Sequence, residues 1–311
     1  MAAFTAQMVK ELREMTGVGM LDCKKALVET DGDMDKAVEY LREKGLAASA
    51  KKAGRIASEG VAKAYITDDN KIGVVVEVNS ETDFVAKNPL FQEYVQQVAE
   101  QAVKSDATNI DDFLAEKWIF DETLTVKEEL SQKVAVIGEN LTIRRFEKFV
   151  KADGHTLVSY VHGNGRIGVM IELSSDKDFD KLHELGKNLC MQIAALNPKF
   201  IYQEDVSEEY IEHEKEILAK QAKEDPKNAS KPDNIILKMI EGRLKKELKE
   251  LCLVEQPYVK DSDMAVKDYI NSVAKEIGDE IKIVRVVRFE TGEGLAKKEE
   301  NFADEVAKAM K

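Results

Sequence analysis

The stretch YITDDNKIGVVVEVNSETDF, residues 65–84, occurs a second time in the chain as YVHGNGRIGVMIELSSDKDF, residues 160–179. The two stretches align without a gap at an offset of 95 residues, and both carry a tyrosine, an Ile-Gly-Val run, a glutamate and an Asp-Phe pair at matched positions. A second match, IGENLTI at 137–143 with IGDEIKI at 277–283, has an offset of 140. Self-similarity of this kind indicates an internal duplication.

Each copy carries the pattern of a small sheet covered by helices. Two runs rich in β-branched residues are joined by a polar turn and followed by a helical stretch. A third strand-like run ends each copy, LTIRRFEKFV at 141–150 and IKIVRVVRFE at 281–290. The sequence therefore predicts an α+β fold in which a small antiparallel sheet with its helices occurs twice.

The second copy is longer than the first between its helix and its third strand. Because the offset increases from 95 to 140, about 45 additional residues lie between Phe179 and Ile277. They fit residues 203–256, where two charged helical segments flank a loop that contains Pro226 and Pro232. This arrangement predicts an inserted antiparallel helical hairpin.

The first 45 residues have the pattern of a separate unit. TGVG at 16–19 interrupts a helical pattern, Asp33 is placed to cap a third helix, and Gly45 is placed to end it. A three-helix module of this size resembles ubiquitin-associated modules, which hold a partner with an exposed loop and helix end. We expect these divisions: a ubiquitin-associated-like module at 1–45, a linker helix at 46–59, core subdomains at 60–150 and at 151–202 with 257–291, a coiled-coil or dimerisation-type hairpin at 203–256, and a C-terminal module at 292–311.

The composition is that of a soluble globular protein. The 311 residues are 43% hydrophobic and 34% charged, and no apolar run reaches the length of a membrane span. The N-terminus lacks the pattern of a signal or transit peptide, so we expect a cytoplasmic protein. The cysteines, Cys23, Cys190 and Cys252, are odd in number and far apart, which predicts reduced core residues.

The net charge of -13 argues against direct binding of nucleic acid, because such binding depends on cations that displace counterions from phosphates. One basic cluster, Lys51 and Lys52 with Arg55, could contact a phosphate. The same residues are also typical of the solvated face of a helix, and we favour that interpretation.

No catalytic or cofactor site is indicated by the remaining motifs. GNGRIG at 163–168 has the letters of a dinucleotide fingerprint, but a strand pattern follows it where the fingerprint requires a helix. The first copy has DDNKIG there, so a hairpin turn is the better interpretation. The histidines lack metal-ligand spacing, and no serine or cysteine has a nucleophile context. We expect no enzymatic activity and no cofactor.

Phe84 in ETDFVAKN, residues 81–88, has two interpretations that the spacing does not separate. Phe179 stands at the matched place in the second copy, so each phenylalanine could seal the end of a sheet. Alternatively, Asn88 and Pro89 begin a helix and place Phe84 in a short connection, where binding residues concentrate.

Two long segments, LREMTGVGMLDCKKAL at 12–27 and EVNSETDFVAK at 77–87, resemble the signatures of the bacterial elongation factor Ts family. The similarity continues through SYVHGNGRIGV, KMIEGRLKKEL and RFETGEG and spans nearly the whole chain. The resemblance implies an N-terminal helical module, two core subdomains, an inserted hairpin and a C-terminal helix.

The resemblance also implies a function. Members of the family bind elongation factor Tu, a GTPase, and release its GDP; the T-D-F-V segment contacts the nucleotide domain with its phenylalanine near the magnesium and phosphate site. It further implies a possible homodimer or 2:2 complex, and a generic adaptor or chaperone remains the alternative. The partner-binding positions carried over are Thr82, Asp83, Phe84, Val85, Arg13, Met20, Leu21, Ile137, Gly138, His162, Val259 and Met310.

Overall fold

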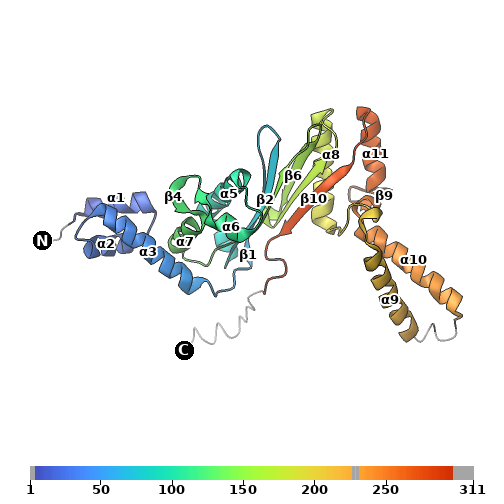
Figure 1. Cartoon of the computed structure of the whole chain (residues 1–311), viewed down its shortest axis with the longest axis horizontal. Helices are drawn as coiled ribbons and strands as arrows, with labels where there is room; N and C mark the ends of the chain where they lie inside the picture. The colour runs from blue at the N-terminus through green and yellow to red at the C-terminus, as the bar shows by residue number, and fades with distance from the viewer. Residues whose placement is uncertain (1–3, 226–227, 229–230, 297–311) are drawn as a thin grey trace.

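A computed structural model describes residues 4–225, 228 and 231–296 (Figure 1). The molecule is elongated, with three N-terminal helices at one end, a mixed α and β region in the middle, and a helical hairpin projecting at the other end. Met310 and the helix expected at the C-terminus lie outside the described residues.

The duplication is confirmed by the topology of two three-stranded antiparallel sheets. The first contains β1 (Glu59–Ile66), β2 (Ile72–Ser80) and β5 (Thr142–Val150), in the order β1-β2-β5. The second contains β6 (Thr156–His162), β7 (Ile167–Leu173) and β10 (Ile283–Glu290), in the order β10-β7-β6. In both copies the second strand is central and the third strand returns beside it.

Helices cover one face of each sheet. In the first copy these are α4 (Asp83–Ala86), α5 (Pro89–Lys104), α6 (Ile110–Ala115) and α7 (Val126–Ile137). In the second copy they are α8 (Phe179–Leu196) and α11 (Val266–Ile277). A capping box begins α7, where the Thr125 side chain accepts a hydrogen bond from the backbone N–H of Glu128.

The duplication extends further than the sequence matches indicated. A small hairpin precedes the third strand of each sheet: β3 (Lys117–Trp118) with β4 (Asp121–Thr125), and β8 (Pro257–Tyr258) with β9 (Asp261–Ala265). One buried glutamine holds each hairpin. Gln101 donates to the carbonyl of Lys117 at 3.2 Å, and Gln192 donates to that of Pro257 at 3.0 Å. The two hairpins therefore share a fold and an anchor.

The uncovered faces of the two sheets pack against each other around Val75, Phe149, Leu157, Met170 and Val287. Close approach requires glycine at matched places, because a Cβ on Gly73 would overlap the sulfur of Met170 and one on Gly168 would lie 3.1 Å from Val75.

Cation–π contacts across this interface are reciprocal. The Arg145 guanidinium lies 4.3 Å from the ring centre of Phe289, and that of Arg285 lies 4.1 Å from the ring centre of Phe149. Arg145 corresponds to Arg285 and Phe149 to Phe289 at the 140-residue offset. The two copies are thus related by approximate two-fold symmetry.

A buried glutamate lies in the central strand of each sheet. Glu77 accepts hydrogen bonds from Arg145 at 2.6 Å and Arg144 at 2.9 Å. Glu172 accepts from Arg285 at 2.6 Å and pairs with His155 at 2.7 Å. Burial acts to raise the pKa of Glu172, but the hydrogen bonds from His155 and Arg285 outweigh it and hold that pKa below the ordinary value. The charged form therefore stabilises the fold at neutral pH, and this contribution is lost as the pH falls through the folded-state pKa.

The N-terminal helices are α1 (Ala6–Thr16), α2 (Met20–Glu29) and α3 (Met34–Lys52), with Asp33 capping α3 as predicted. Leu12, Cys23 and Leu27 belong to their common core. The prediction that Gly45 ends the third helix is wrong, because α3 continues through it to Lys52. A Cβ on Gly45 would lie 3.7 Å from that of Ala135, so this glycine lies where α3 packs on α7.

The hairpin consists of α9 (Glu208–Glu224) and α10 (Asp233–Leu251), which pack through an apolar cluster of their own. That cluster contains Leu218, Ala222, Ile240 and Leu244. Short 3-10 turns flank the hairpin, η2 (Gln203–Asp205) and η4 (Leu253–Glu255). At its base the N–H groups of Lys199 and Phe200 donate to the carbonyl of Leu251 at 3.0 and 3.2 Å. The two ends of the hairpin thus meet at the second copy.

We expect the core to fold without this hairpin. Replacing residues 207–249 by a short Gly/Ser linker should change the free energy of unfolding of the remainder by less than about 1 kcal/mol, because closing a short loop costs little and the hairpin core is separate. Urea unfolding followed by circular dichroism provides the measurement, with the full chain as control. Loss of a cooperative transition would show that the hairpin is part of the core.

All three cysteines are free and buried, as predicted. Burial raises the pKa of the Cys190 thiol well above its ordinary value, so this group stays neutral. Within the described part of the chain, no helix is both long enough and apolar enough to cross a bilayer.

Candidate functional site

Phe84 is exposed on α4, a four-residue helix between β2 and α5. Its side chain is 82% exposed, whereas the next two residues face inward: Val85 packs against the core and Ala86 is buried. Thr82 caps the helix by accepting from the Val85 N–H at 3.3 Å. Asp83 pairs with Lys87 at 2.6 Å, and this hydrogen bond holds the pKa of Asp83 below its ordinary value. The short helix therefore presents Phe84 to solvent.

The loop after α7 lies directly against the segment that precedes α4. The Glu139 carboxylate accepts from the N–H groups of Glu81 at 3.1 Å and Thr82 at 3.0 Å, and from the Thr82 hydroxyl at 2.7 Å. In return Glu81 accepts from the N–H of Asn140 at 2.6 Å. The T-D-F-V segment is thus brought together with the exposed Gly138, which ends α7 in the left-handed conformation at φ 89°.

Glu81 and Glu139 are not among the partner-binding positions predicted from the sequence. Glu81 lies within ETDFVAKN at 81–88 and Glu139 within IGENLTI at 137–143, but their contact joins two loops that are 58 residues apart in the chain. The matched positions in the second copy are also acidic, Asp176 and Asp279. This repetition of acidic residues was the signal in the sequence that could have drawn attention to Glu81 and Glu139.

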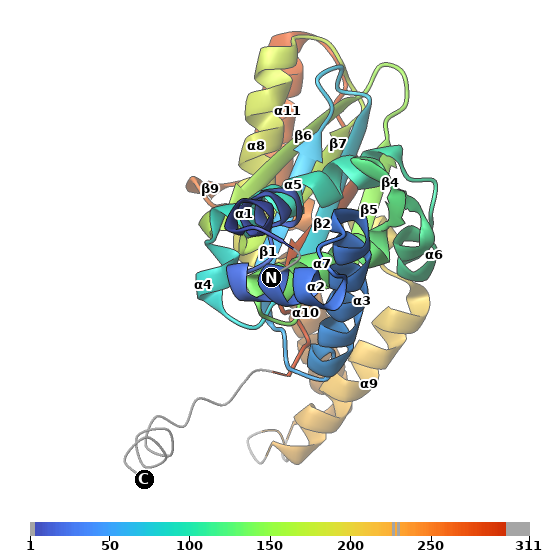
Figure 2. The same ribbon diagram turned by 90° about the vertical axis from the view of Figure 1, so that its left-hand side faces the viewer.

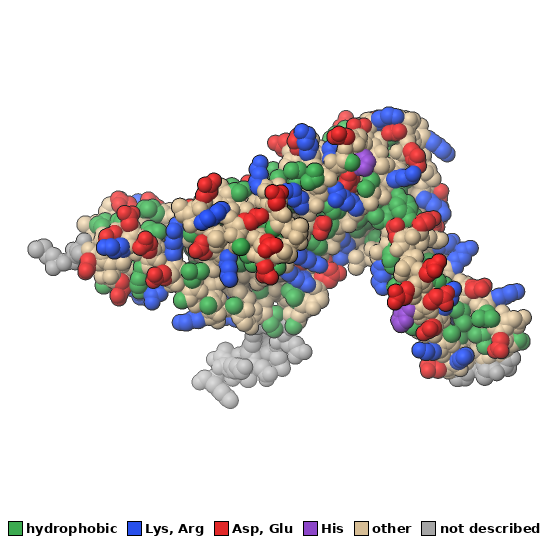
Figure 3. All heavy atoms as spheres, viewed as in Figure 1, with side chains coloured by type: hydrophobic (Ala, Val, Ile, Leu, Met, Phe, Trp, Pro, Cys, Tyr) green, Lys and Arg blue, Asp and Glu red, His purple; other side chains and the backbone are tan. Residues whose placement is uncertain are grey.

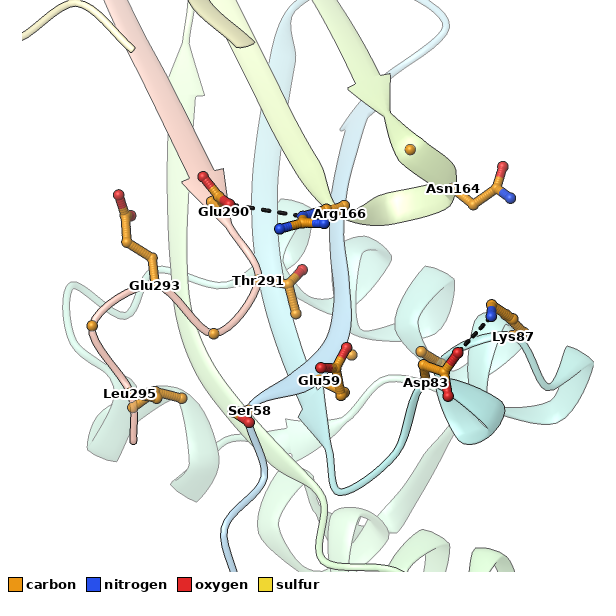
Figure 4. Close-up of a pocket in the computed structure, with 15 residues that line it drawn as sticks. Ser58, Glu59, Asp83, Lys87, Asn164, Arg166, Glu290, Thr291, Glu293 and Leu295 are labelled. Atoms are coloured by element: carbon orange, nitrogen blue, oxygen red, sulfur yellow. Dashed lines mark hydrogen bonds and ion pairs between the residues drawn. The ribbon is translucent and has the colours of Figure 1, made fainter. Parts of the chain in front are cut away.

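The turn between β6 and β7 faces α4 across a hollow of about 670 Å³ (Figure 4). Asp83 and Lys87 lie on one side, while Asn164 and Arg166 lie on the other, with Arg166 3.8 Å from Glu290. The GNGRIG segment forms this turn, with a 3-10 turn at Gly163–Gly165, and β7 follows it. The interpretation as a hairpin turn is confirmed.

His162 is exposed at the beginning of this turn. Its Nδ1 lies 2.9 Å from the hydroxyl of Tyr160, whose ring also contacts the imidazole with a centroid distance of 5.9 Å. The histidine is therefore held on the surface, and the next residue, Gly163, lines the hollow.

The N-terminal positions are exposed on α1 and α2. Arg13 and Met20 are exposed, and Leu21 is 73% exposed. The turn between these helices touches the end of α7, because a Cβ on Gly17 would lie 3.9 Å from Val136. The N-terminal helices thus lie next to the loop that contacts α4.

Val259 lies in the turn between β8 and β9 and is 45% exposed. It is distant from α4 along the molecule, but both segments project from the same flank (Figure 2). The described candidate residues therefore lie along an extended surface and do not converge on one pocket. Met310, the remaining candidate, lies outside the described residues.

Phe179 does not have the role that one interpretation gave it. It is the first residue of α8, is 50% exposed, and stacks on His183 with ring centres 5.8 Å apart. The idea that this phenylalanine seals the second sheet is wrong, because Leu182 and Leu185 fill the core position one turn later.

Charged side chains of both signs alternate over the visible face, without a concentrated basic area (Figure 3). In the basic cluster noted above, Lys52 donates to the carbonyl of Val134 at 3.3 Å and Arg55 pairs with Glu81 at 3.4 Å. Two of its three members therefore bind groups of the protein itself.

Comparison with known proteins gives a consistent result. A family described as Elongation factor TS matches residues 81–293. Over 306 residues the chain is 53% identical to Elongation factor Ts of Clostridium novyi (strain NT), covering 98% of both chains. Over 311 residues it is 52% identical to Elongation factor Ts of Clostridioides difficile (strain 630), covering 100% of both. This chain therefore belongs to the elongation factor Ts family and is a translation elongation factor.

Proposed function

We propose that this protein is a guanine-nucleotide exchange factor that binds elongation factor Tu in its GDP form and promotes release of the GDP. The observation that carries the proposal is Phe84, a large aromatic side chain that is 82% exposed on an anchored short helix. Exposed aromatic residues on rigid elements are typical anchors of protein interfaces. Family membership supports the identity of the partner.

The mechanism is linkage between two binding equilibria. A factor that binds the nucleotide-free GTPase more tightly than the GDP form must weaken GDP binding by the same factor. Phe84 would enter the partner near its magnesium and phosphate site, with Thr82, Asp83 and Val85 setting its position. GTP could then replace GDP, and no residue of this chain would form or break a covalent bond.

The other candidate residues would extend the contact. Ile137 and Gly138 at the end of α7 and His162 before the β6–β7 turn would contact the partner beside α4. Arg13, Met20 and Leu21 at one end and Val259 at the other would fix the orientation of the partner. Contacts at several separated points supply affinity that a single exposed helix could not provide.

A release assay with elongation factor Tu loaded with mant-GDP tests the proposal. Adding this protein and excess unlabelled GDP should accelerate the loss of fluorescence, in proportion to its concentration until saturation. Binding of elongation factor Tu without faster release would contradict the proposal and favour an adaptor. Binding of several unfolded clients would favour a chaperone.

We expect Met20 and Leu21 to contribute affinity and not release itself. The double substitution Met20→Ala with Leu21→Ala should raise the half-saturating concentration about tenfold, which corresponds to about 1.4 kcal/mol of binding free energy, with an unchanged rate at saturation. Leu237→Ala is the control, because Leu237 is 60% exposed on the distant α10. Normal half-saturation of the double variant would remove α2 from the proposed interface.

A further inference from the structure

We infer that Glu139 is a positioning residue for Phe84, an inference that rests on the proposed function. The helix that carries Phe84 has four residues, Asp83–Ala86, and a helix this short is not stable by itself in water. Its order therefore depends on contacts that other parts of the chain make with its ends and its inner face.

Glu139 provides the contact at the N-terminal end. Its two carboxylate oxygens receive three hydrogen bonds, two from the N–H groups of Glu81 and Thr82 and one from the Thr82 hydroxyl. Hydrogen bonds to an ionised acceptor are stronger than neutral ones, and a negative charge is favourable at a helix N-terminus. The Thr82 hydroxyl in turn accepts from the Val85 N–H. A continuous chain of hydrogen bonds thus joins Glu139 to the first turn of α4.

The contact is local to this helix. Glu139 and Thr82 are both partly exposed, so water can satisfy the N–H and hydroxyl groups if the carboxylate is removed. Removing the Glu139 carboxylate should therefore change the stability of the core little. Its main effect should be greater conformational freedom of α4. A partner that binds only the ordered helix then binds more weakly, in proportion to the fraction of molecules in which the helix is ordered.

The second copy offers a matched comparison. Asp279 corresponds to Glu139, but it accepts from the Ser175 hydroxyl at 2.7 Å and pairs with the Lys177 ammonium at 3.1 Å. The helix that follows there is α8, with 18 residues and an extensive buried face. The order of α8 therefore does not depend on a carboxylate at its N-terminal end. Asp279→Ala removes a negative charge from the equivalent loop and serves as the control.

The experiment uses the full chain with Glu139→Ala, and the first readout is hydrogen exchange in the free protein. The amides of Val85, Ala86 and Lys87, which donate within α4 and its cap, should exchange about tenfold faster than in the unchanged protein, while amides of β2 stay protected. Asp279→Ala should leave the α4 amides unchanged. This readout does not depend on any partner, so it can fail or succeed independently of the proposed function.

The second readout is release of mant-GDP from elongation factor Tu. Glu139→Ala should raise the half-saturating concentration about tenfold with the rate at saturation within twofold. Glu139→Gln, which keeps a carbonyl acceptor for the two N–H groups, should restore part of the difference. At a concentration well below half-saturation, combining Glu139→Ala with Phe84→Ala should slow release no further than Phe84→Ala alone, because both changes remove the same contact.

Three results would overturn the inference: unchanged exchange of the α4 amides, an equal effect of Asp279→Ala on release, or additive effects of Glu139→Ala and Phe84→Ala. If the unchanged protein failed to accelerate release at all, the proposed function would be wrong, while the hydrogen-exchange result would still decide whether Glu139 orders α4.

Discussion

Replacing Phe84 by alanine should slow GDP release by about ten- to a hundredfold and leave the melting temperature nearly unchanged. A buried phenylalanine truncated to alanine costs about 3 to 5 kcal/mol of folding free energy, whereas an exposed anchor costs little in the free protein. Phe84 is 82% exposed and therefore belongs to the second class. Loss of about 1.4 to 2.8 kcal/mol from the complex in which GDP leaves gives the stated change in rate.

Phe179→Ala is the matched control for this prediction. Phe179 follows an Asp at the equivalent place of the second copy, and it is also substantially exposed, at 50%. Its truncation should remove only the stacking on His183 and leave release at its normal rate. Thermal unfolding and mant-GDP release measured on both variants separate the two phenylalanines. Normal release by Phe84→Ala would show that the exposed aromatic ring is not the element that expels GDP.

Glu77→Gln should destabilise the fold by about 3 kcal/mol. The side chain of Glu77 is 0% exposed and accepts hydrogen bonds from Arg144, Arg145 and the N–H of Gly292. Removing one partner of a buried ion pair leaves an uncompensated charge in a region of low dielectric, which costs about 3 to 5 kcal/mol. We expect a destabilisation at the lower end of this range, because both arginine side chains retain some contact with solvent. Urea unfolding at neutral pH measures the change.

Glu147→Gln on the same sheet is the control. Glu147 lies on β5 and is exposed, and substitutions at exposed positions usually change the free energy of unfolding by about 0.5 kcal/mol or less. An equal effect of the two substitutions would mean that overall charge, and not the buried pair, determines the change. A stable Glu77→Gln variant would show that the arginines find other acceptors.

The fold was predictable from the sequence where the two copies constrain each other. The strands of both sheets repeat the same apolar pattern and the same glutamate, so the duplication fixed their pairing and excluded the dinucleotide fingerprint at 163–168. The prediction for Gly45 failed because glycine both ends helices and permits close helix packing, and only the position of α7 distinguishes these uses.

The candidate site was predictable only in part. The resemblance indicated both the T-D-F-V segment and Gly138 as partner-binding positions, and the structure brings them together through Glu139. Spacing alone left Phe84 undecided between core and surface. In the structure Val85 and Ala86 face the core, which leaves Phe84 exposed. This orientation depends on packing against other elements and could not be read from spacing. The Glu139 contacts were not predicted, because hydrogen bonds between distant loops leave no periodic pattern in the chain; the acidic residues at the matched positions of the second copy, Asp176 and Asp279, were the only trace of them.

The reciprocal packing of the two sheets has a consequence for assembly. Gly73 of the first sheet admits Met170 of the second, while Gly168 of the second lies against Val75 of the first, so each copy carries both the recess and the residue that fills one. A surface with this property is self-complementary, as in isologous dimers. The two copies therefore contact each other within one chain in the way that the two subunits of such a dimer do.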